Sequence, residues 1–327
     1  MKIGINVMGY PGDRNPIDNA VQAEAEGFES IWMTDGNGRM DALTAAAAIG
    51  ARTSRVRIGL GIVPVFNRPP AVLAASAVAL SHIAPDRVVL GVGSSSQTMI
   101  ERWYGMEFRK PLTRVRETVE LMRQMFTGER TAYDGETVRS HGFRLTSQLK
   151  GAMPIHVAAL RPGMLELAGE IGDGVVLNLT PAELLPRVLE HVDTGAKRSG
   201  RRVEDLEIVS LLNTFVTDDV AAGTQAMRRV ALGYYSTGVY ASFLAWLGRP
   251  REAEQIRAGF AERDREKTNA ALSDEFVRRL GLVGTADEVR SRLDEYAKAG
   301  LDTAVIWAAS QDESEYEATR AAVLAAA

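Results

Sequence analysis

The sequence alternates short apolar runs with longer amphipathic runs along most of its 327 residues. A predicted helix follows each apolar run, and this order is typical of strand–helix units on a parallel sheet. Eight such units in one chain favour an α/β fold of the (β/α)8 barrel (TIM barrel) type over an open doubly wound sheet. The predicted strands are residues 2–8, 30–34, 57–62, 87–91, 155–158, 174–177, 206–216 and 303–307.

Two segments interrupt this alternation. Residues 131–145 contain Tyr133-Asp134-Gly135-Glu136, a hairpin signal, and predict a β-hairpin inserted after the fourth helix. The helix of the seventh strand is predicted at 220–232, and residues 234–280 are predicted to be a helical insertion before the eighth strand. Because α/β barrels commonly exceed the usual domain length, residues 1–327 are predicted to form one domain.

Composition excludes several classes of function. The chain has 38 basic and 42 acidic residues, without the basic excess that a nucleic-acid surface needs. It has no cysteine, which excludes disulfides, thiolate metal sites and cysteine nucleophiles. No run of about 18 apolar residues predicts a membrane span, and the first residues do not read as a signal peptide. These features predict a cytoplasmic protein that acts on a small molecule, with neither nucleic acid nor membrane as partner.

Acid–base and metal-binding motifs are scarce. The four histidines, at positions 82, 141, 156 and 191, form neither an HxH nor an HExxH pair, so no metal site is predicted. No G-x-S-x-G motif is present, which disfavours a serine hydrolase. Gly59-Leu60-Gly61 and Gly91-Val92-Gly93 begin a G-x-G-x-x-G fingerprint without completing it, so a Rossmann nicotinamide site is also disfavoured.

Small polar residues and glycines stand where barrel enzymes carry their sites, just after the strands. Gly93-Ser94-Ser95-Ser96 ends the fourth strand region, and residues 158–163 run from the fifth strand into a helix with Pro162 in its first turn. Free N–H groups at a helix N-terminus favour a phosphate. The alternative for each segment is an ordinary tight turn without a ligand.

Five segments in this order carry a resemblance to a known family. They are MKIGINV at the N-terminus, GFESIWMTD at 27–35, RIGLGIVPVFNRPPAVLAASAVALSHIAPDRVVLGVGSSS at 57–96, PIHVAALRPGMLELAGEIGDGVVLN at 154–178 and LVGTADEVRSRLDEYAKAGLDTAVI at 282–306. On these segments the chain resembles the bacterial luciferase-like superfamily, and most of all its branch of deazaflavin (coenzyme F420) dependent oxidoreductases. The resemblance covers almost the whole chain.

The resemblance implies a cofactor site. A non-proline cis peptide at Gly61–Ile62, continuing into Val63, would support the central ring of the cofactor, and Asp35 would lie beside that ring. Asn67 and Arg68 match a polar pair of this branch. Gly93, Ser94 and Ser95 would form a polar wall, and Ala159, Leu160, Arg161, Pro162, Gly163 and Met164 would hold the phosphate. The alternatives are a cap for Asp35, a strand-end glycine for Gly61 and a solvated loop for Asn67 and Arg68.

The chain departs from relatives that oxidise sugar phosphates or secondary alcohols. Those relatives place His after the acidic residue and Glu in the fourth-strand turn, where this chain has Gly36 and Ser96. The departure favours a reductase that takes its proton from solvent, Tyr104 or His156, with Asp35 and Tyr104 as the predicted catalytic residues. Aromatic residues at predicted strand tops would line an apolar pocket: Trp32, Phe66, Trp103, Tyr104 and Trp307. Residues 234–246 would form a lid or a dimer face.

The predicted function is therefore hydride transfer between F420 and a small organic substrate by a chain that is expected to be a homodimer. One alternative is an FMN-dependent luciferase-like monooxygenase that uses reduced flavin and oxygen. An alternative of another class is a barrel subunit without catalytic activity.

Overall fold

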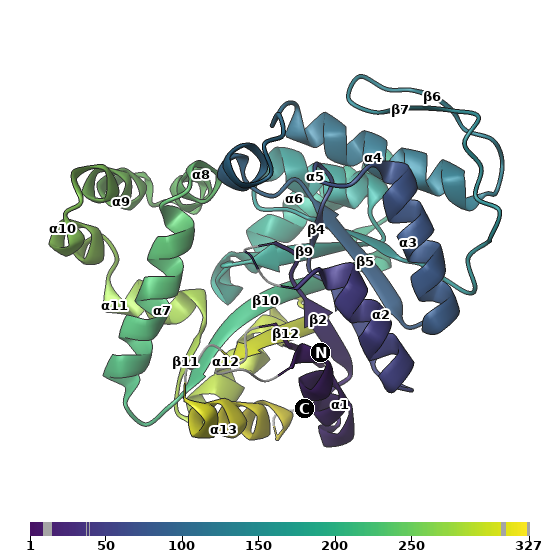
Figure 1. Ribbon diagram of the computed structural model, residues 1–327. Coiled ribbons are helices and arrows are strands. Elements are labelled where there is room, and N and C mark those ends of the chain that lie inside the picture. The colour runs from purple at the N-terminus through teal and green to yellow at the C-terminus, as the bar shows by residue number, and fades with distance from the viewer. Residues whose placement is uncertain (9–14, 37, 39, 309–311, 326–327) are drawn as a thin grey trace.

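Eight parallel strands close into a barrel in the computed structural model, which describes residues 1–8, 15–36, 38, 40–308 and 312–325 (Figure 1). Each strand pairs with the next along the chain, and pairings of the last strand with the first complete the ring. The predicted (β/α)8 barrel is confirmed. Its strands are β1 (Lys2–Asn6), β2 (Ser30–Met33), β3 (Arg57–Leu60), β5 (Val88–Gly93), β8 (Ile155–Ala158), β9 (Gly174–Asn178), β10 (Glu207–Val216) and β12 (Thr303–Ala308). Two short strands extend the sheet: β4 (Val63–Pro64) beside β5, and β11 (Leu282–Gly284) beside β10.

Eight helices surround the barrel in the described part of the chain. Several of them begin with proline, whose missing N–H costs nothing at a position that has no intrahelical partner. The outer helices are α1 (Pro16–Glu26), α2 (Ala42–Arg52), α3 (Pro70–Ile83), α4 (Pro111–Phe126), α5 (Pro162–Ile171), α6 (Leu185–Arg198), α12 (Ala286–Lys298) and α13 (Glu313–Leu324).

The predicted hairpin is confirmed as β6 (Ala132–Asp134) and β7 (Arg139–His141), which pair antiparallel after α4. The carboxylate of Glu117 on α4 accepts the backbone N–H groups of Glu136 and Thr137 in the turn, at 2.6 and 2.7 Å. A Cβ at Gly135 would lie 2.6 Å from the carboxyl carbon of Glu117, so the turn needs a glycine there.

The helical insertion is larger than the sequence predicts. It contains α7 (Val220–Tyr235), α8 (Gly238–Trp246), α9 (Pro250–Glu262), α10 (Arg265–Ala270) and α11 (Asp274–Leu280), and it forms a lobe on one side of the barrel (green in Figure 1). The lobe has its own apolar core, to which α7 contributes Met227 and Tyr235. The prediction that 220–232 is the barrel helix of the seventh strand is wrong, because α12 packs Leu293 and Tyr296 on the main core instead. Both helices are amphipathic, and amphipathicity alone does not tell which core a helix faces.

The barrel interior is filled by Trp32. Its side chain is fully buried, its indole Nε1 donates to Ser30 Oγ at 2.9 Å, and a Cβ at Gly59 would overlap the ring. Side chains on a barrel strand alternate between the inside and the outside, and Trp32 falls on the inside, below the mouth. The expectation that Trp32 lines a pocket is therefore wrong, because the residue is part of the packed interior together with Val89, Val176, Val209, Leu211 and Val305.

His156 lies toward the opposite, N-terminal end of the barrel. It is 1% exposed, and its Nε2 is 3.5 Å from an oxygen of Glu207, the first residue of β10. Arg57, the first residue of β3, holds the same carboxylate with two hydrogen bonds of 2.8 and 2.9 Å. The expectation that His156 supplies a proton to the substrate is wrong, because the side chain points into the barrel interior, away from the C-terminal ends of the strands.

Burial gives His156 a clear pH signature. Because burial disfavours the charged ring, it lowers the pKa of His156 to about 4, from about 6.5 in an unfolded chain. The unfolded chain then takes up the proton first as pH falls. We expect the free energy of unfolding to decrease by up to about 3 kcal/mol between pH 6.5 and 4 on account of this one residue. Denaturant titrations across this range measure the loss.

The variant His156→Leu removes the titrating group, so its stability should change less between pH 6.5 and 4. His141→Leu is the matched control, since His141 is exposed on the hairpin. Equal pH slopes for His156→Leu and the unmodified chain would contradict this account.

Candidate active site

A cavity of about 630 Å³ opens at the C-terminal end of the barrel. Its walls come from the segment that links β2 to α2, from the residues after β4 and from the segment after β5. Five residues that the sequence singles out meet here, namely Asp35, Asn67, Arg68, Trp103 and Tyr104. The cavity is lined by Asp35, Gly36, Gly38, Asp41, Asn67, Arg68, Trp103 and Tyr104.

Arg68 joins two carboxylates of this cavity. It donates to Asp35 Oδ2 at 2.5 Å and also contacts Asp41, the N-cap of α2. Burial alone would lower the pKa of Arg68, but Asp35 and then Asp41 raise it overall. Burial likewise opposes ionisation of Asp41, yet hydrogen bonds from Thr44 and the charge of Arg68 hold the pKa of Asp41 below its usual range. The interpretation of Arg68 as solvated loop is wrong, since its side chain is only 16% exposed.

Asp35 lies on the cavity wall and also forms the cap that the sequence offers as its alternative role. Its side chain is 5% exposed at the cavity wall, and its Oδ1 accepts the backbone N–H of Ala42 at 3.2 Å, which caps α2. Its own backbone N–H donates to the carbonyl of Ile62 at 3.3 Å. Asp35 therefore ties the end of β2 to the segment that follows β3.

That segment contains the predicted non-proline cis peptide, Gly61–Ile62, which is confirmed. Gly61 N–H donates to the Met33 carbonyl at 2.7 Å, and Val63 pairs with Val92 of β5. The segment from Gly61 to Val63, which we call the ledge, is therefore hydrogen-bonded to both neighbouring strands.

The ledge borders an apolar floor at the barrel mouth. Ile62 and Ala158 are half-buried and pack on the inner cluster around Trp32 and Leu211. A Cβ at Gly93 would lie 3.0 Å from the Cβ of Ala158 and 3.1 Å from Cδ1 of Ile62, so any larger residue would fill the space between them. Glycine at this position lets Ile62 and Ala158 pack close to the strand, and together they form an apolar floor.

A π-helical turn, η1 (Thr98–Trp103), carries the aromatic side of the cavity. The sequence analysis does not predict this π-helical turn. The Ser96 hydroxyl accepts the N–H of Met99 at 3.3 Å, and the Ser95 hydroxyl lies 3.0 Å from the sulfur of Met99. The turn places Trp103 and Tyr104 on the cavity, with 58% and 39% of each residue exposed.

The two remaining aromatic residues predicted to line the pocket lie in different surroundings. Phe66 is buried against Phe108, with ring centroids 4.9 Å apart, so the expectation that it lines the pocket is wrong. Trp307 stands at the top of β12, opposite Asn213 of β10, and is half-buried.

The segment predicted to hold a phosphate lies further round the mouth, after β8. Ala159 is buried, Leu160 packs on the lobe core, and Arg161 is the exposed N-cap of α5 with Pro162 in the first turn. The N–H of Met164 donates back to the Arg161 carbonyl at 3.0 Å. A Cβ at Gly163 would lie 3.2 Å from Leu112, so the starts of α5 and α4 are adjacent.

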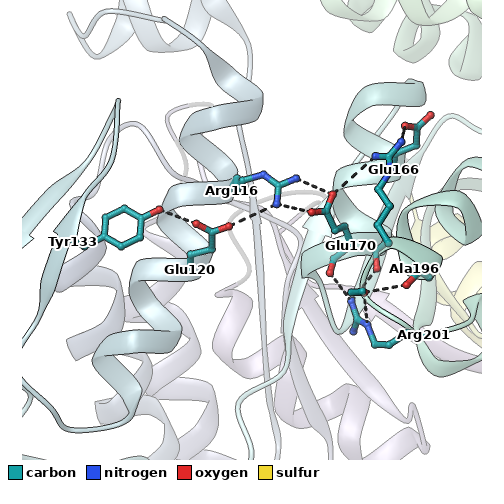
Figure 2. Close-up of polar contacts among 10 residues, drawn as sticks. Arg116, Glu120, Tyr133, Glu166, Glu170, Ala196 and Arg201 are labelled. Carbon is teal, nitrogen blue, oxygen red and sulfur yellow. Dashed lines mark hydrogen bonds and ion pairs between the residues drawn. The ribbon is translucent and has the colours of Figure 1, made fainter.

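Ion pairs hold α5 from both sides, as Figure 2 shows. Arg116 on α4 makes two bonds of 2.8 Å to Glu170, and Arg198 on α6 makes one of 2.6 Å to Glu166. On the far side of Arg116, Tyr133 of the hairpin donates to Glu120 at 2.8 Å. This network fixes the position of the helix whose N-terminus borders the mouth.

The lobe contacts the end of β9. Asn178, the last residue of β9, donates through Nδ2 to the hydroxyl of Tyr240 on α8 at 2.8 Å. Sequence reasoning placed Tyr240 only within a lid or dimer face. The many aromatic residues of segment 234–246 can be recognised in the sequence. The contact of this segment with β9 cannot be predicted from the sequence.

Two negative findings apply to the described part of the chain. No group of three or more His, Asp or Glu side chains there is arranged to hold a metal ion. No described helix is long and apolar enough to cross a membrane.

The fold and site define a (β/α)8 barrel whose mouth combines a cis-peptide ledge, an apolar floor and a mostly paired set of charges. Residues 7–303 match the family model described as luciferase-like monooxygenase. The chain belongs to this family.

Curated relatives cover most of the chain. It is 28% identical over 288 residues to 5,10-methylenetetrahydromethanopterin reductase of Archaeoglobus fulgidus, covering 86% of each protein. It is 28% identical over 325 residues to F420-dependent glucose-6-phosphate dehydrogenase of Nocardia farcinica, covering 93% of this chain and 91% of that protein. The structure of the F420-dependent tetrahydromethanopterin reductase from Methanopyrus kandleri has the same fold, with a TM-score of 0.81, 20% identity and coverage of 98% and 96%.

The clamp on α5 makes a stability prediction. Replacing Arg116 by Met keeps the alkyl stem but removes a two-bond ion pair, which should lower the free energy of unfolding by about 1 kcal/mol. Thermal unfolding should show a decrease in Tm of about 2 °C. Arg52→Met is the control, since that residue makes a single, largely exposed pair with Asp18. An equal effect of both substitutions would show that the clamp adds nothing beyond an ordinary surface pair.

Proposed function

We propose that this protein is a coenzyme F420-dependent oxidoreductase that moves hydride between the deazaflavin and a small organic substrate. The observation that carries the proposal is the barrel mouth, where the cis-peptide ledge at Gly61–Ile62 and the apolar floor of Ile62 and Ala158 accompany a cavity of about 630 Å³. The names of the relatives support it, because both a reductase and a dehydrogenase among them are described as F420-dependent.

The residues that would hold this cofactor form three groups. The ledge of Gly61, Ile62 and Val63 would support the ring, with Asp35 and Asn67 at one edge. Gly93, Ser94 and Ser95 would form the wall after β5. The segment from Ala159 to Met164 would take the phosphate with backbone N–H groups and the Arg161 guanidinium. When bound, the deazaflavin supplies a carbon that gives or accepts hydride.

The proposed fit of the cofactor ring depends on the shape of the barrel mouth and on its apolar surface. Ile62 and Ala158 offer apolar contact from below, and the charges of Arg68, Asp35 and Asp41 are matched to one another. A mostly apolar pocket with a few placed polar groups is the usual form of a cofactor site. Asp35 and Tyr104, which the sequence predicts as catalytic residues, line the wall of this cavity.

The direction we propose is reduction of the substrate. At Gly36, where alcohol- and sugar-oxidising members carry His, a Cβ would lie 3.0 Å from Met99 and 3.5 Å from the Tyr104 hydroxyl. At Ser96, where they carry Glu, the hydroxyl is engaged by the N–H of Met99. Oxidation of an alcohol needs a base to take its proton, whereas reduction needs a proton donor, which a tyrosine supplies.

The proposal extends to the state of the protein in the cell. We propose a cytoplasmic homodimer that acts on a small molecule. Exposed apolar side chains on α3, at Val72 and Ile83, would suit a contact between copies. Light scattering measures the mass in solution.

The deciding experiment is a fluorescence titration of the purified protein with oxidised F420 and, separately, with FMN. We expect micromolar binding of F420 and weaker binding of FMN. The reverse preference would replace the proposal by an FMN-dependent luciferase-like monooxygenase. Binding of neither would leave a barrel subunit without catalytic activity.

The floor at Gly93 makes a second prediction, which concerns the affinity for F420. Gly93→Ala places a methyl group between Ile62 and Ala158 and should raise the Kd for F420 about tenfold, or about 1.4 kcal/mol. Gly233→Ala on α7 is the matched control, since no atom lies within 4 Å of its added Cβ. Unchanged affinity in Gly93→Ala, with the fold intact by circular dichroism, would place the ring elsewhere.

A further inference from the structure

We infer that Tyr240 is the proton donor of this site and that Asn178 stabilises the phenolate left behind. The inference rests on the proposed function in its reducing direction and adds a catalytic residue to it. Tyr240 gives its proton to the substrate atom that becomes basic when hydride reaches the neighbouring carbon.

Strand register places Asn178 inside the mouth. In β9 it comes two residues after Val176, which faces the barrel interior, so its side chain lies on the same face. It pairs with Leu211 of β10, another interior residue. Leu211 in turn lies 3.8 Å from the position of a Cβ on Gly61. Asn178 is therefore one side chain away from the ledge, on the opposite wall from Asp35.

The hydrogen bond between Asn178 and Tyr240 leaves the phenolic proton free. Asn178 Nδ2 donates to the Tyr240 oxygen, so that oxygen is the acceptor of the pair. No hydrogen-bond acceptor for the Tyr240 proton occurs among the described residues. Tyr240 as a whole residue is half-buried. The ring packs on Tyr234 at 4.8 Å between centroids and on Phe243 at 6.5 Å, which fixes its direction.

The surroundings keep the Tyr240 phenol protonated. Burial and then the neighbouring Tyr234 raise the pKa of Tyr240, so the phenol carries its proton throughout the neutral range, while the Asn178 bond opposes that shift. The hydrogen bond from the Asn178 N–H to the phenol oxygen becomes stronger as negative charge develops on that oxygen. This lowers the barrier to proton loss from the phenol. The same bond that orients the acid therefore stabilises its conjugate base.

The step balances for a carbonyl substrate. Hydride from the reduced deazaflavin forms a C–H bond at the carbonyl carbon, and the π-bond electrons move to oxygen. For a conjugated ketone the hydride adds at the β-carbon, the electrons reach the same oxygen, and the enol formed there on protonation becomes the saturated ketone by tautomerisation in water. The Tyr240 O–H bond breaks as its proton joins that oxygen, and water later reprotonates the phenolate. The substrate is reduced by two electrons and the deazaflavin is oxidised by two.

Other candidates for this proton fit less well. His156 points into the barrel interior from the second residue of β8, and its pKa is lowered to about 4, so it holds no proton at neutral pH. Tyr104 lies on the Asp35 side of the mouth at the rim, where solvent reaches it. Water is the remaining candidate donor, and proton transfer from water would not require Tyr240.

The test uses three tyrosine-to-phenylalanine variants that keep the ring. They are Tyr240→Phe, the competing Tyr104→Phe and the control Tyr133→Phe, whose hydroxyl serves Glu120 on the hairpin. The probe is cyclohexenone. First, F420 affinity is measured for each variant, and Tyr240→Phe should match the unmodified protein within about twofold.

Next, cyclohexenone is titrated into the protein loaded with oxidised F420, where no turnover occurs, and deazaflavin fluorescence is followed. Loss of one hydrogen bond should weaken its binding about fivefold to tenfold in Tyr240→Phe. Then single turnovers of the reduced holoenzyme with the same ketone are timed in H2O and D2O. Tyr240→Phe should be about 100-fold slower, the usual contribution of general acid catalysis, and should show a changed solvent isotope effect.

Asn178→Ala is the second variant, which leaves the acid in place without its partner. We expect it to slow turnover about tenfold while F420 still binds. A rate in Tyr240→Phe like that of Tyr133→Phe, or a larger loss in Tyr104→Phe, would overturn the inference. So would an unmodified protein that binds F420 but neither binds nor reduces cyclohexenone. Failure of the unmodified protein to bind F420 at all would instead overturn the proposed function.

Discussion

The contact between Trp32 and the glycines of the neighbouring strands supports the whole mouth of the barrel. A closed barrel of eight strands must fill its interior with side chains. Here one large indole does so, and this is possible only because Gly59 beside it has no Cβ. Gly61 rests on the same ring, since its Cβ position is 3.2 Å from the indole. The ledge is therefore supported from within the barrel, and its position depends on packing rather than on any ligand.

Much of the barrel could be predicted from the sequence, because its strands are short apolar runs set apart by amphipathic helices. The cis peptide at Gly61–Ile62 and the position of Asp35 followed from a resemblance of motifs in order. Three features could not be predicted for physical reasons. Trp32 reads as apolar whether it faces a pocket or the interior, α7 is amphipathic whichever core it joins, and the π-helical turn before Tyr104 depends on contacts of Ser96 with residues nearby.

The charges at the mouth explain why the chemistry falls to neutral groups. Arg68 is held by Asp35 and Asp41, and its raised pKa shows that the cation is stabilised by these partners. Charges matched in this way keep the wall in place but are poorly suited to move protons, since adding a proton to a carboxylate or removing one from Arg68 breaks the match. Groups that change little in charge at neutral pH, such as phenols and amides, then remain for the substrate side.

Two apolar clusters support different parts of the site. The inner cluster around Trp32 carries the floor of Ile62 and Ala158, while the lobe packs around another apolar cluster, to which Phe215 of β10 also contributes. Tyr240 belongs to the lobe and reaches the barrel through a single side-chain bond to Asn178. Substitutions within the lobe can therefore reshape the substrate wall without moving Gly61 or Trp32.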